Sequence, residues 1–336
     1  MADEAWQMRA DHKSSKQLPL VRVTGRRPCA VCRRADWCSA SADGAIAICM
    51  RRRSERPTAN GGWLHRLDKV LQAQPAPARS FVRSQQAAER AGINQCDAVY
   101  SMLLAKHLEL SPHHRLSLLE RGLTAESIEL NDYATAPRSE RAPEIAHQLA
   151  RDFDLRHVPG FYQEQGRWKM VNLGSGFYVP VRDTRGRIRG LQLRRDHGSP
   201  RYLWLSSPGR PGGSSSGAPV HFSAPHLIRN THEAIITEGA LKADVISQCL
   251  DRAVIALAGV NSFSEQFARL LTESLPELHH VQLAYDQDWR EKHQVRLALF
   301  RLLRSLRSSG LSVLVSTWPR HFKGYDDFLV GRHTLS

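Results

Sequence analysis

The sequence predicts a multidomain protein of mixed α/β and α+β class with four successive parts. Four of its six cysteines fall between residues 29 and 49, a β-hairpin pattern covers residues 177–193, and strands alternate with helices over the last hundred residues. At 336 residues the chain has room for two or three small domains, each with its own core. We therefore expect an N-terminal β-hairpin zinc ribbon, a helical middle segment, a basic mixed α+β subdomain and a C-terminal domain built on a parallel sheet.

The N-terminal part, residues 1–71, is predicted to bind zinc through Cys29, Cys32, Cys38 and Cys49. Cys29 and Cys32 form a Cys-x2-Cys knuckle, and Asp43-Gly44 is a turn signal that would put Cys38 and Cys49 on paired strands. Four thiolates make a closed tetrahedral site, so we expect the zinc to be structural. His65 is an alternative ligand that could replace one cysteine.

Positive charge is concentrated in the same part of the chain. The whole sequence carries a net charge of +14, and residues 1–70 hold 14 Lys and Arg against 7 Asp and Glu, a surplus of 7. Such a surplus suits phosphate contacts, so nucleic acid is the expected partner; charge that only aids solubility is the alternative. Trp37 and Trp63 would stack on single-stranded bases or, equally, cover the zinc site. The predicted DNA contacts are Arg33, Arg34, Arg51, Arg52, Arg53 and Trp37.

The next two parts are predicted from composition and periodicity. Residues 72–94 are rich in Pro, Ala and Gln, which is typical of a linker. Residues 95–150 form the predicted helical segment, because apolar residues recur there at helical spacing, with a break at Ser111-Pro112.

Residues 151–230 are predicted to form the basic subdomain. Its hairpin turns at Asp183 to Gly186, and a third strand is expected at 201–205. The loop at 206–219 contains mainly Ser, Gly and Pro, so it is either a mobile lid or a simple insertion.

Residues 231–336 are predicted to form the parallel-sheet domain. Strands are expected at 234–238, 253–258, 280–285 and 311–317, with helices near 241–250, 263–274 and 291–308. Strands that alternate with helices of this length imply right-handed crossovers.

Two of these strands end in acidic residues: Glu238 before Gly239, and Asp286 with Asp288. The carboxyl ends of parallel strands meet at the edge where such sheets bind ligands, and carboxylates are the ligands that Mg²⁺ and Mn²⁺ prefer. The alternative is that Asp286 and Asp288 cap the next helix. Asp326 and Asp327 either add ligands or cap the terminal helix.

The sequence argues against a membrane or secreted protein. No apolar run reaches the about 18 residues that a spanning helix needs, and the first 16 residues are polar. We therefore expect a cytoplasmic location without a membrane partner. Thiols are kept reduced there, so the cysteine cluster favours metal over disulfides.

These motifs, in this order, resemble bacterial-type DNA primases. Glu238-Gly239 and Asp286-x-Asp288 are similar to the acidic motifs of the TOPRIM domain, and residues 179–208 are similar to the basic subdomain that precedes it. The resemblance implies a nucleotidyltransferase that joins nucleoside triphosphates into short primers on single-stranded DNA, with Mg²⁺ or Mn²⁺. It implies that Glu238, Asp286 and Asp288 hold the catalytic metal, and that template or nucleotide contacts come from Arg194, Arg201, Arg187 and Lys242.

The sequence also departs from the family pattern. Lys242 stands where the family commonly has an acid, Tyr325-Asp326-Asp327 stands for Asp-Pro-Asp, and the ribbon has four cysteines where the family includes a histidine. No helicase-binding region follows the TOPRIM part, so a replicative helicase would act in trans. These departures suggest a primase of a plasmid, phage or integrative element.

Two other functions stay open. A non-polymerising accessory protein of replication or recombination, or a TOPRIM nuclease, would keep the same ribbon or metal site. The basic hairpin at 177–205 favours the primase over both, and a relaxing topoisomerase would need a much larger clamp around DNA.

Overall fold

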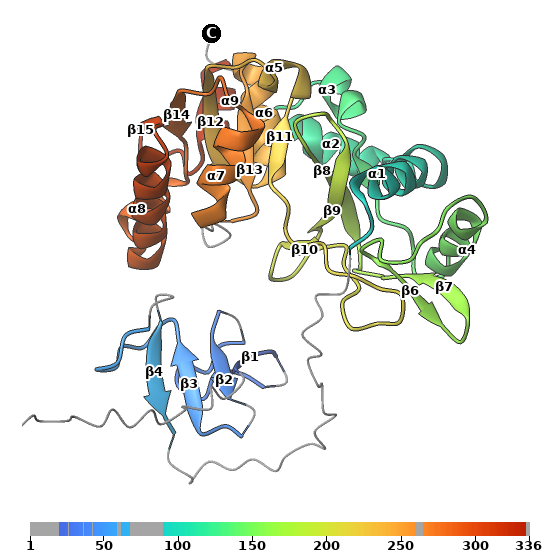
Figure 1. Ribbon diagram of the computed structural model, residues 1–336, viewed down its shortest axis with the longest axis horizontal. Coiled ribbons are helices and arrows are strands. Elements are labelled where there is room, and N and C mark those ends of the chain that lie inside the picture. Colours follow the sequence, from blue (N-terminus) through green and yellow to red (C-terminus); the bar gives the residue numbers. More distant parts are fainter. Residues whose placement is uncertain are drawn as a thin grey trace, which may run out of the picture. The chain divides into compact units, whose positions relative to one another are not determined.

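The computed structural model describes residues 20–25, 27–35, 37–41, 43–58, 62–67, 90–259 and 265–333. The chain divides into two compact units, Met1–Arg83 and Ser84–Ser336, whose elements are labelled in Figure 1. Residues 72–89 of the predicted linker lie outside the described residues. Within the described ranges, every helix is too short or too polar to cross a bilayer.

The N-terminal unit is a small antiparallel sheet. Its strands β1 (Leu20–Arg22), β2 (Ser39–Ser41), β3 (Ile46–Cys49) and β4 (Trp63–Arg66) pair in chain order. The predicted turn joins β2 to β3, because Asp43 Oδ1 accepts a hydrogen bond from the Ala45 amide at 3.1 Å and Gly44 has a φ of +74°. The buried residues of this unit's hydrophobic cluster are Val23, Cys29, Cys38 and Cys49. Cysteine side chains therefore occupy the positions that aliphatic side chains fill in most small domains.

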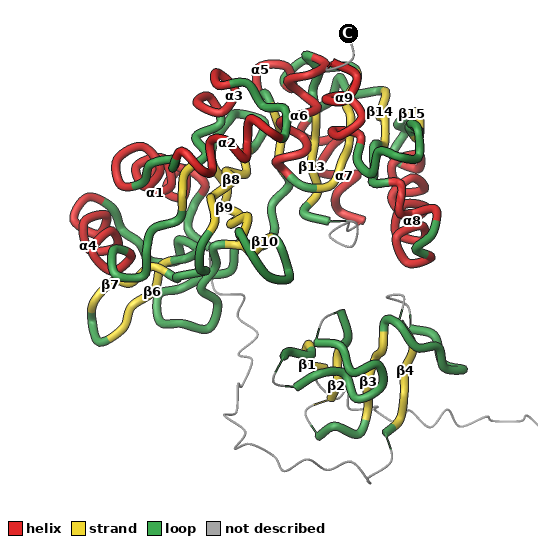
Figure 2. The backbone as a smooth tube through the Cα atoms, turned by 180° about the vertical axis from the view of Figure 1, so that it is seen from behind, coloured by secondary structure: helices red, strands yellow, loops and turns green. Residues whose placement is uncertain are grey.

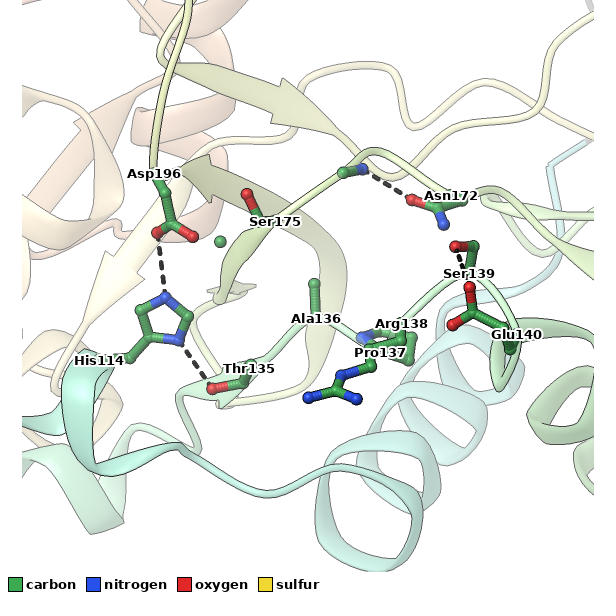
Figure 3. Close-up of a pocket in the computed structure, with 12 residues that line it drawn as sticks. His114, Thr135, Ala136, Pro137, Arg138, Ser139, Glu140, Asn172, Ser175 and Asp196 are labelled. Atoms are coloured by element: carbon green, nitrogen blue, oxygen red, sulfur yellow. Dashed lines mark hydrogen bonds and ion pairs between the residues drawn. The ribbon is translucent and has the colours of Figure 1, made fainter.

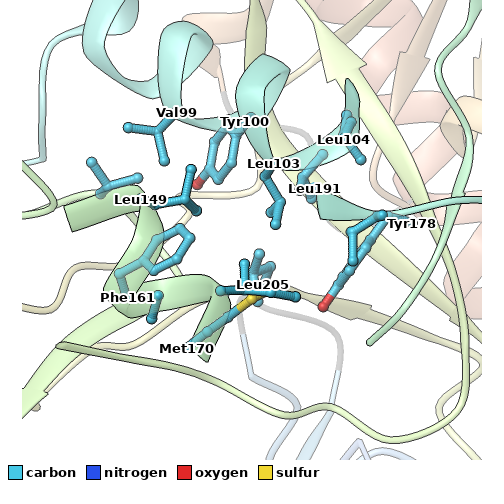
Figure 4. Packing of buried hydrophobic residues seen from close by; sticks show 14 of the residues in the cluster. Val99, Tyr100, Leu103, Leu104, Leu149, Phe161, Met170, Tyr178, Leu191 and Leu205 are labelled. Carbon is cyan, nitrogen blue, oxygen red and sulfur yellow. The ribbon is translucent and has the colours of Figure 1, made fainter. Parts of the chain in front are cut away.

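The second unit begins with short helices, as predicted. They are α1 (Ile93–Met102), which continues as the π-helix η2 (Leu103–His107), then α2 (Pro112–Glu120), α3 (Ala125–Leu130) and α4 (Ala142–Asp152). The predicted break is the start of α2: the Ser111 side chain accepts a hydrogen bond from the His114 amide, and Pro112 takes the first helical position. Figure 4 shows Tyr100, Leu103 and Leu149 packed with Phe161 and Leu191, which joins helices to strands.

The predicted basic hairpin is present. Strands β8 (Gly176–Arg182) and β9 (Ile188–Arg195) pair antiparallel, with β10 (Tyr202–Trp204) on β9 and the short β5 (Ala134–Thr135) on β8. Asp183 Oδ1 accepts hydrogen bonds from the amides of Arg185 at 2.9 Å and Arg187 at 3.0 Å, which stabilises the turn. A separate hairpin, β6 (Phe161–Glu164) with β7 (Arg167–Met170), was not predicted.

The Ser-Gly-Pro loop at 206–219 packs against β6. The Ser207 hydroxyl is buried, donates a hydrogen bond to the Phe161 carbonyl at 2.7 Å and accepts one from the Gly160 amide at 3.1 Å. The Arg210 guanidinium lies 4.2 Å from the centre of the Tyr162 ring. Of the two alternatives from the sequence, these contacts describe a packed insertion.

The C-terminal part is the predicted parallel sheet with helices on both faces. The strands of this sheet lie in the order β11 (His221–Ser223), β13 (Val254–Leu257), β12 (Glu233–Glu238), β14 (His280–Leu283) and β15 (Ser312–Val315). Of these five strands, only β11 pairs antiparallel with its neighbour, and it is the one strand of this sheet that was not predicted from the sequence. The helices here are α5 (Pro225–Ile228), α6 (Ala240–Leu250), α7 (Glu265–Ser274), η4 (Gln287–Arg290), α8 (His293–Ser308) and α9 (Tyr325–His333).

Successive residues of the central strand β12 face the two layers. Ile236 packs in the cluster with α7 and α8, whereas Ile235 packs with α6 and α9. Figures 1 and 2 show these two helix layers from opposite sides. The carboxyl ends of the parallel strands are therefore the edge at which α6 and η4 begin.

Candidate functional site

The four predicted cysteines gather in the N-terminal unit. Their Sγ atoms all lie within 4.8 Å of one another, with 3.7 Å between Cys32 and Cys38 and 4.0 Å between Cys38 and Cys49. Four sulfurs bound at ~2.3 Å to one zinc would stand about 3.8 Å apart, so the set fits a structural zinc site. The predicted alternative ligand, His65, instead hydrogen-bonds through Nε2 to the Arg52 carbonyl at 3.0 Å.

Backbone amides approach the sulfurs in the way that stabilises thiolates. The Met50 amide donates to Cys38 at 3.4 Å, and the Arg52 amide donates to Cys49 at 3.2 Å. Burial nevertheless raises the pKa of Cys38 to about 12. At Cys32 burial acts in the same direction, but hydrogen bonds from Arg34 and the neighbouring cysteines lower its pKa to about 7. Zinc must therefore displace protons when it binds this set.

The predicted DNA contacts of this unit face solvent. Arg33, Arg34 and Arg51 to Arg53 are exposed, and Trp37 is 61% exposed. An indole in that position contributes little to covering the zinc site and offers a face for base stacking. Trp63 is half-buried, and the Arg53 guanidinium lies 5.9 Å from its ring centre.

In the second unit, the acidic strand ends come to one edge of the parallel sheet. The register of β12 against β14 pairs Ile236 with Leu283, so Glu238 lies level with Tyr285 and next to Asp286. The Thr237 hydroxyl donates to the Ala284 carbonyl at 2.9 Å and ties the two strand ends together. Gly239, with a φ of +88°, then starts α6.

A lysine lies among these carboxylates. The Lys242 ammonium, in the first turn of α6, forms an ion pair with Asp286 Oδ1, and the Lys323 ammonium lies 3.7 Å from Asp286 Oδ2. Burial lowers the pKa of Lys242, but the charges of Asp286, Asp326 and Glu238 outweigh it and leave that pKa raised. The side chain of Lys242 is therefore the common neighbour of three carboxylates.

The two residues of the second acidic pair, Asp326 and Asp327, make different contacts. Asp327 Oδ2 accepts a hydrogen bond from the Gly324 amide at 3.1 Å, so this carboxylate caps α9. Asp326 instead faces the guanidinium of Arg121, which lies 3.3 Å from its Oδ2. Burial raises the pKa of Asp326, and its Oδ1 is buried without a hydrogen-bond partner. We call Glu238, Asp286, Asp326 and Lys242 the acidic centre.

The acidic centre fits a divalent metal only in part. Among the described side chains, the sets of three or more ligand atoms within 4.8 Å are the four cysteines, His113–His114–Asp196 and His232–Glu277–His279, and the carboxylates of the acidic centre do not form such a set. The side chain of Asp288 lies outside the described residues. Asp286 has an ammonium near each oxygen, whereas the unpartnered Oδ1 of Asp326 fits a cation.

Of the predicted basic residues, Arg194 lies on β9, Arg201 follows that strand and Arg187 lies in the turn before it. The Arg194 guanidinium lies 5.3 Å from the Phe177 ring centre; burial lowers the pKa of Arg194, and the nearby charges of Arg121 and Arg201 lower it further. The charge of Arg121 thus acts on Arg194 as well as on Asp326. Arg187 instead pairs with Asp183 at 2.7 Å and donates to Asn94 Oδ1 at 2.9 Å, so it holds the hairpin turn against α1.

Sequence reasoning missed Arg121 and Lys323. Arg121 follows α2, and its contact with Asp326 joins residues 205 positions apart. Lys323 reaches Asp286 because the Gln287 amide donates to the Lys323 carbonyl at 3.1 Å and the Gln287 side chain donates to the Trp318 carbonyl at 2.8 Å. Local sequence patterns carry no signal for either contact.

A separate pocket of about 430 Å³ lies at the end of β9 and includes Arg138 and Ser175 (Figure 3). At its edge, His114 Nε2 donates to Asp196 Oδ1 at 3.0 Å, and a hydrogen bond of 2.8 Å joins His114 Nδ1 and the Thr135 hydroxyl. Both ring nitrogens are thus engaged within the protein. We interpret His114 as a support for the end of β9.

The comparisons with known proteins agree with this fold. A family described as a domain of unknown function (DUF3854) matches residues 226–334, and no curated protein matches the sequence. The structure is similar to the zinc-binding and RNA polymerase domains of the Aquifex aeolicus primase (22% identity, TM-score 0.53) over 71% of this chain and 56% of that one. It therefore spans little more than half of that structure.

Two further structures show the same likeness. The RNA polymerase domain of the Mycobacterium tuberculosis primase DnaG is 14% identical, with a TM-score of 0.54, over 71% of this chain and 82% of that one. A DnaG primase catalytic domain bound to ssDNA is 18% identical, with a TM-score of 0.51, over 71% and 75%. The chain thus has the fold of the catalytic core of bacterial primases, which confirms the resemblance inferred from the sequence at the level of the fold.

Proposed function

We propose that the protein is a DNA primase that makes short primers on single-stranded DNA, in the replication of a plasmid, phage or integrative element. One observation carries the proposal: Glu238, Asp286 and Asp326 gather around Lys242 at the carboxyl edge of the parallel sheet, and the Arg121 guanidinium lies 3.3 Å from Asp326 Oδ2. Guanidinium groups bind the phosphates of a triphosphate, and charged groups fixed beside them stabilise the charge that develops when the triphosphate reacts.

The reaction joins two nucleotides. The 3′-hydroxyl of one gives up its proton to water and attacks the α-phosphorus of the next, a new P–O bond forms, the bond to the bridging oxygen breaks, and pyrophosphate leaves. Mg²⁺ or Mn²⁺ bound by Glu238, Asp286 and Asp288, with Asp326 as a further ligand, would stabilise charge on the entering and leaving oxygens. Arg194 and Arg201 would hold the triphosphate or template, because guanidinium groups contact phosphate bidentately.

The N-terminal unit would bring the template. Its exposed arginines would contact the backbone of single-stranded DNA, and Trp37 would stack on a base. The zinc would be structural, nucleoside triphosphates would be the substrates, and a replicative helicase would act in trans. One of the solved primase domains with this fold is described as bound to ssDNA, which supports the assignment of the template.

Primer synthesis tests the proposal. We expect the wild type to incorporate labelled nucleotides on a single-stranded template with Mg²⁺ or Mn²⁺, and Asp286→Ala to lose roughly a hundredfold in rate because the acidic centre loses a carboxylate. Asp152→Ala, an exposed aspartate at the end of α4, is the matched control and should retain full activity. A wild type that makes no primers under either ion rules the proposal out.

The non-polymerising accessory protein is a second candidate. It is favoured by the two ammonium groups that face Asp286, since a carboxylate already paired with lysine binds metal less readily. The same assay separates the functions. DNA binding without synthesis, unchanged in Asp286→Ala, would indicate the accessory role, and cleavage of the template would indicate a nuclease.

A further inference from the structure

A set of metal-ligand atoms lies at the amino edge of the parallel sheet, opposite the acidic centre. It consists of His232, Glu277 and His279, which are exposed, and one ligand atom from each lies within 4.8 Å of the others. His232 directly precedes β12, and His279 directly precedes β14, which pairs parallel with it. The six residues of β12, at ~3.3 Å each, put this set about 20 Å from the acidic centre.

The His232 ring is oriented as the ring of a metal ligand is. Its Nδ1 lies 3.0 Å from the carbonyl oxygen of Glu277. A carbonyl oxygen only accepts, so Nδ1 donates its proton and Nε2 keeps the lone pair that can bind a metal. Imidazoles that bind metals almost always donate their other N–H to a carbonyl or carboxylate in this way. Glu277 therefore supplies both the carbonyl that orients the ring and a carboxylate beside it.

The backbone holds both histidines in place. The His232 carbonyl accepts hydrogen bonds from the amides of His279 at 3.0 Å and His280 at 2.9 Å, and the His279 carbonyl accepts one from the Ser312 amide at 2.9 Å. The rings of His232 and His279 stack, with centroids 5.9 Å apart and planes 13° apart. Because the backbone is already fixed, only side-chain rotations have to be ordered when an ion binds.

The ligand types select the kind of ion. Two imidazoles and one carboxylate are a set that Zn²⁺ takes, with a fourth position for water, and nitrogen ligands favour Zn²⁺ over Mg²⁺. Ligand atoms on one tetrahedral zinc stand about 3.4 Å apart, so small rotations of these exposed side chains close the set. In the set His113–His114–Asp196, by contrast, both ring nitrogens of His114 already have protein partners.

We propose that His232, Glu277 and His279 form a Zn²⁺ site separate from the cysteine cluster and from the acidic centre. The ion joins the connection before β12 to the connection between α7 and β14, since His232 and Glu277 are 45 positions apart. Both connections belong to the second unit, so binding of the ion stabilises that unit. The proposal does not rest on primer synthesis.

Zn²⁺ titration of the full-length protein tests the proposal, with the cysteine cluster already loaded with zinc and Mg²⁺ in excess. Calorimetry should show that the wild type binds a further Zn²⁺ per chain. His279→Ala and Glu277→Gln should each weaken this binding by at least about tenfold, because the loss of even an outer-shell partner costs about 10–100-fold in metal affinity. His147→Ala, an exposed histidine on α4, is the matched control and should bind like the wild type.

Thermal unfolding provides a second readout. The melting temperature of the wild type should rise by about 5 °C when free Zn²⁺ exceeds its Kd about a hundredfold. His279→Ala should abolish this rise. Without added Zn²⁺ the two variants should melt like the wild type, because the three side chains are exposed, and this shows that the variants are folded.

Three outcomes would overturn the proposal. They are a wild type that binds no further Zn²⁺, a further Zn²⁺ that binds unchanged in both variants, and a further Zn²⁺ that is lost in His113→Ala and retained in His279→Ala, which would place the ion in the other histidine set. Asp286→Ala should bind this Zn²⁺ like the wild type. Failure of primer synthesis and failure of this site are therefore separate results.

Discussion

Replacing Cys29 and Cys32 with serine is expected to remove the zinc and to unfold the N-terminal unit. The buried cluster of this unit consists of Val23 and three cysteines, and β1 is exposed along its whole length. Little apolar surface is available to offset the entropy of ordering the chain. Structural zinc contributes ~10–16 kcal/mol to such small sites, which is as large as the whole stability of a typical domain.

Three measurements check this result. Zinc content should fall from one to about zero per chain, proteolysis should cut within residues 20–67 while the unit Ser84–Ser336 stays intact, and binding of single-stranded template should weaken. The control is Cys249→Ser, since Cys249 lies outside the cysteine cluster and is only partly buried. Unchanged zinc content in the double variant would refute the ribbon.

The elements that the sequence predicts correctly are those whose signals are local. Asp43-Gly44 specifies the turn between β2 and β3, and Asp183 to Gly186 specify the turn between β8 and β9. Short apolar runs that end in acidic residues predict strands β12 and β14. The helices between these strands are predicted by the length and the helical spacing of their apolar residues. In each case a few consecutive residues carry the structure.

The parts that the sequence does not predict depend on distant contacts. Strand β11 has only three residues and pairs with β13, about thirty positions away, so its pairing leaves no periodic pattern. The ion pair of Lys242 with Asp286 and that of Arg121 with Asp326 likewise join separate elements. A carboxylate motif in the sequence predicts that acidic side chains lie close together, but it does not predict which lysine or arginine side chains form ion pairs with them.

Asp244 provides the clearest case of such a distant network. Its carboxylate, 3% exposed, accepts hydrogen bonds from the Tyr133 hydroxyl at 2.5 Å, the Ser223 hydroxyl at 2.7 Å and His221 Nε2 at 3.0 Å. The Arg182 amide donates to His221 Nδ1 at 3.1 Å, so Nε2 must carry the proton. Burial and the charge of Asp244 together raise the pKa of Tyr133 well above its usual value, which keeps the hydroxyl a donor.

Asp244→Ala is therefore expected to destabilise the second unit by about 4 kcal/mol, because three buried donors lose their acceptor at once. The melting temperature should fall by about 10 °C. Asp244→Asn, which keeps one acceptor oxygen, should lose less, and the exposed Glu120→Ala should change little.

The network and the acidic centre share one helix, because Asp244 lies on α6 two positions after Lys242. If the network holds α6 against β8 and β11, the Asp244→Ala and Tyr133→Phe effects should be less than additive, since both remove the same hydrogen bond. Urea unfolding of the two single variants and the double variant measures this coupling. An additive result, or a loss for Asp244→Ala no larger than that of Glu120→Ala, would show that the carboxylate does not organise this junction.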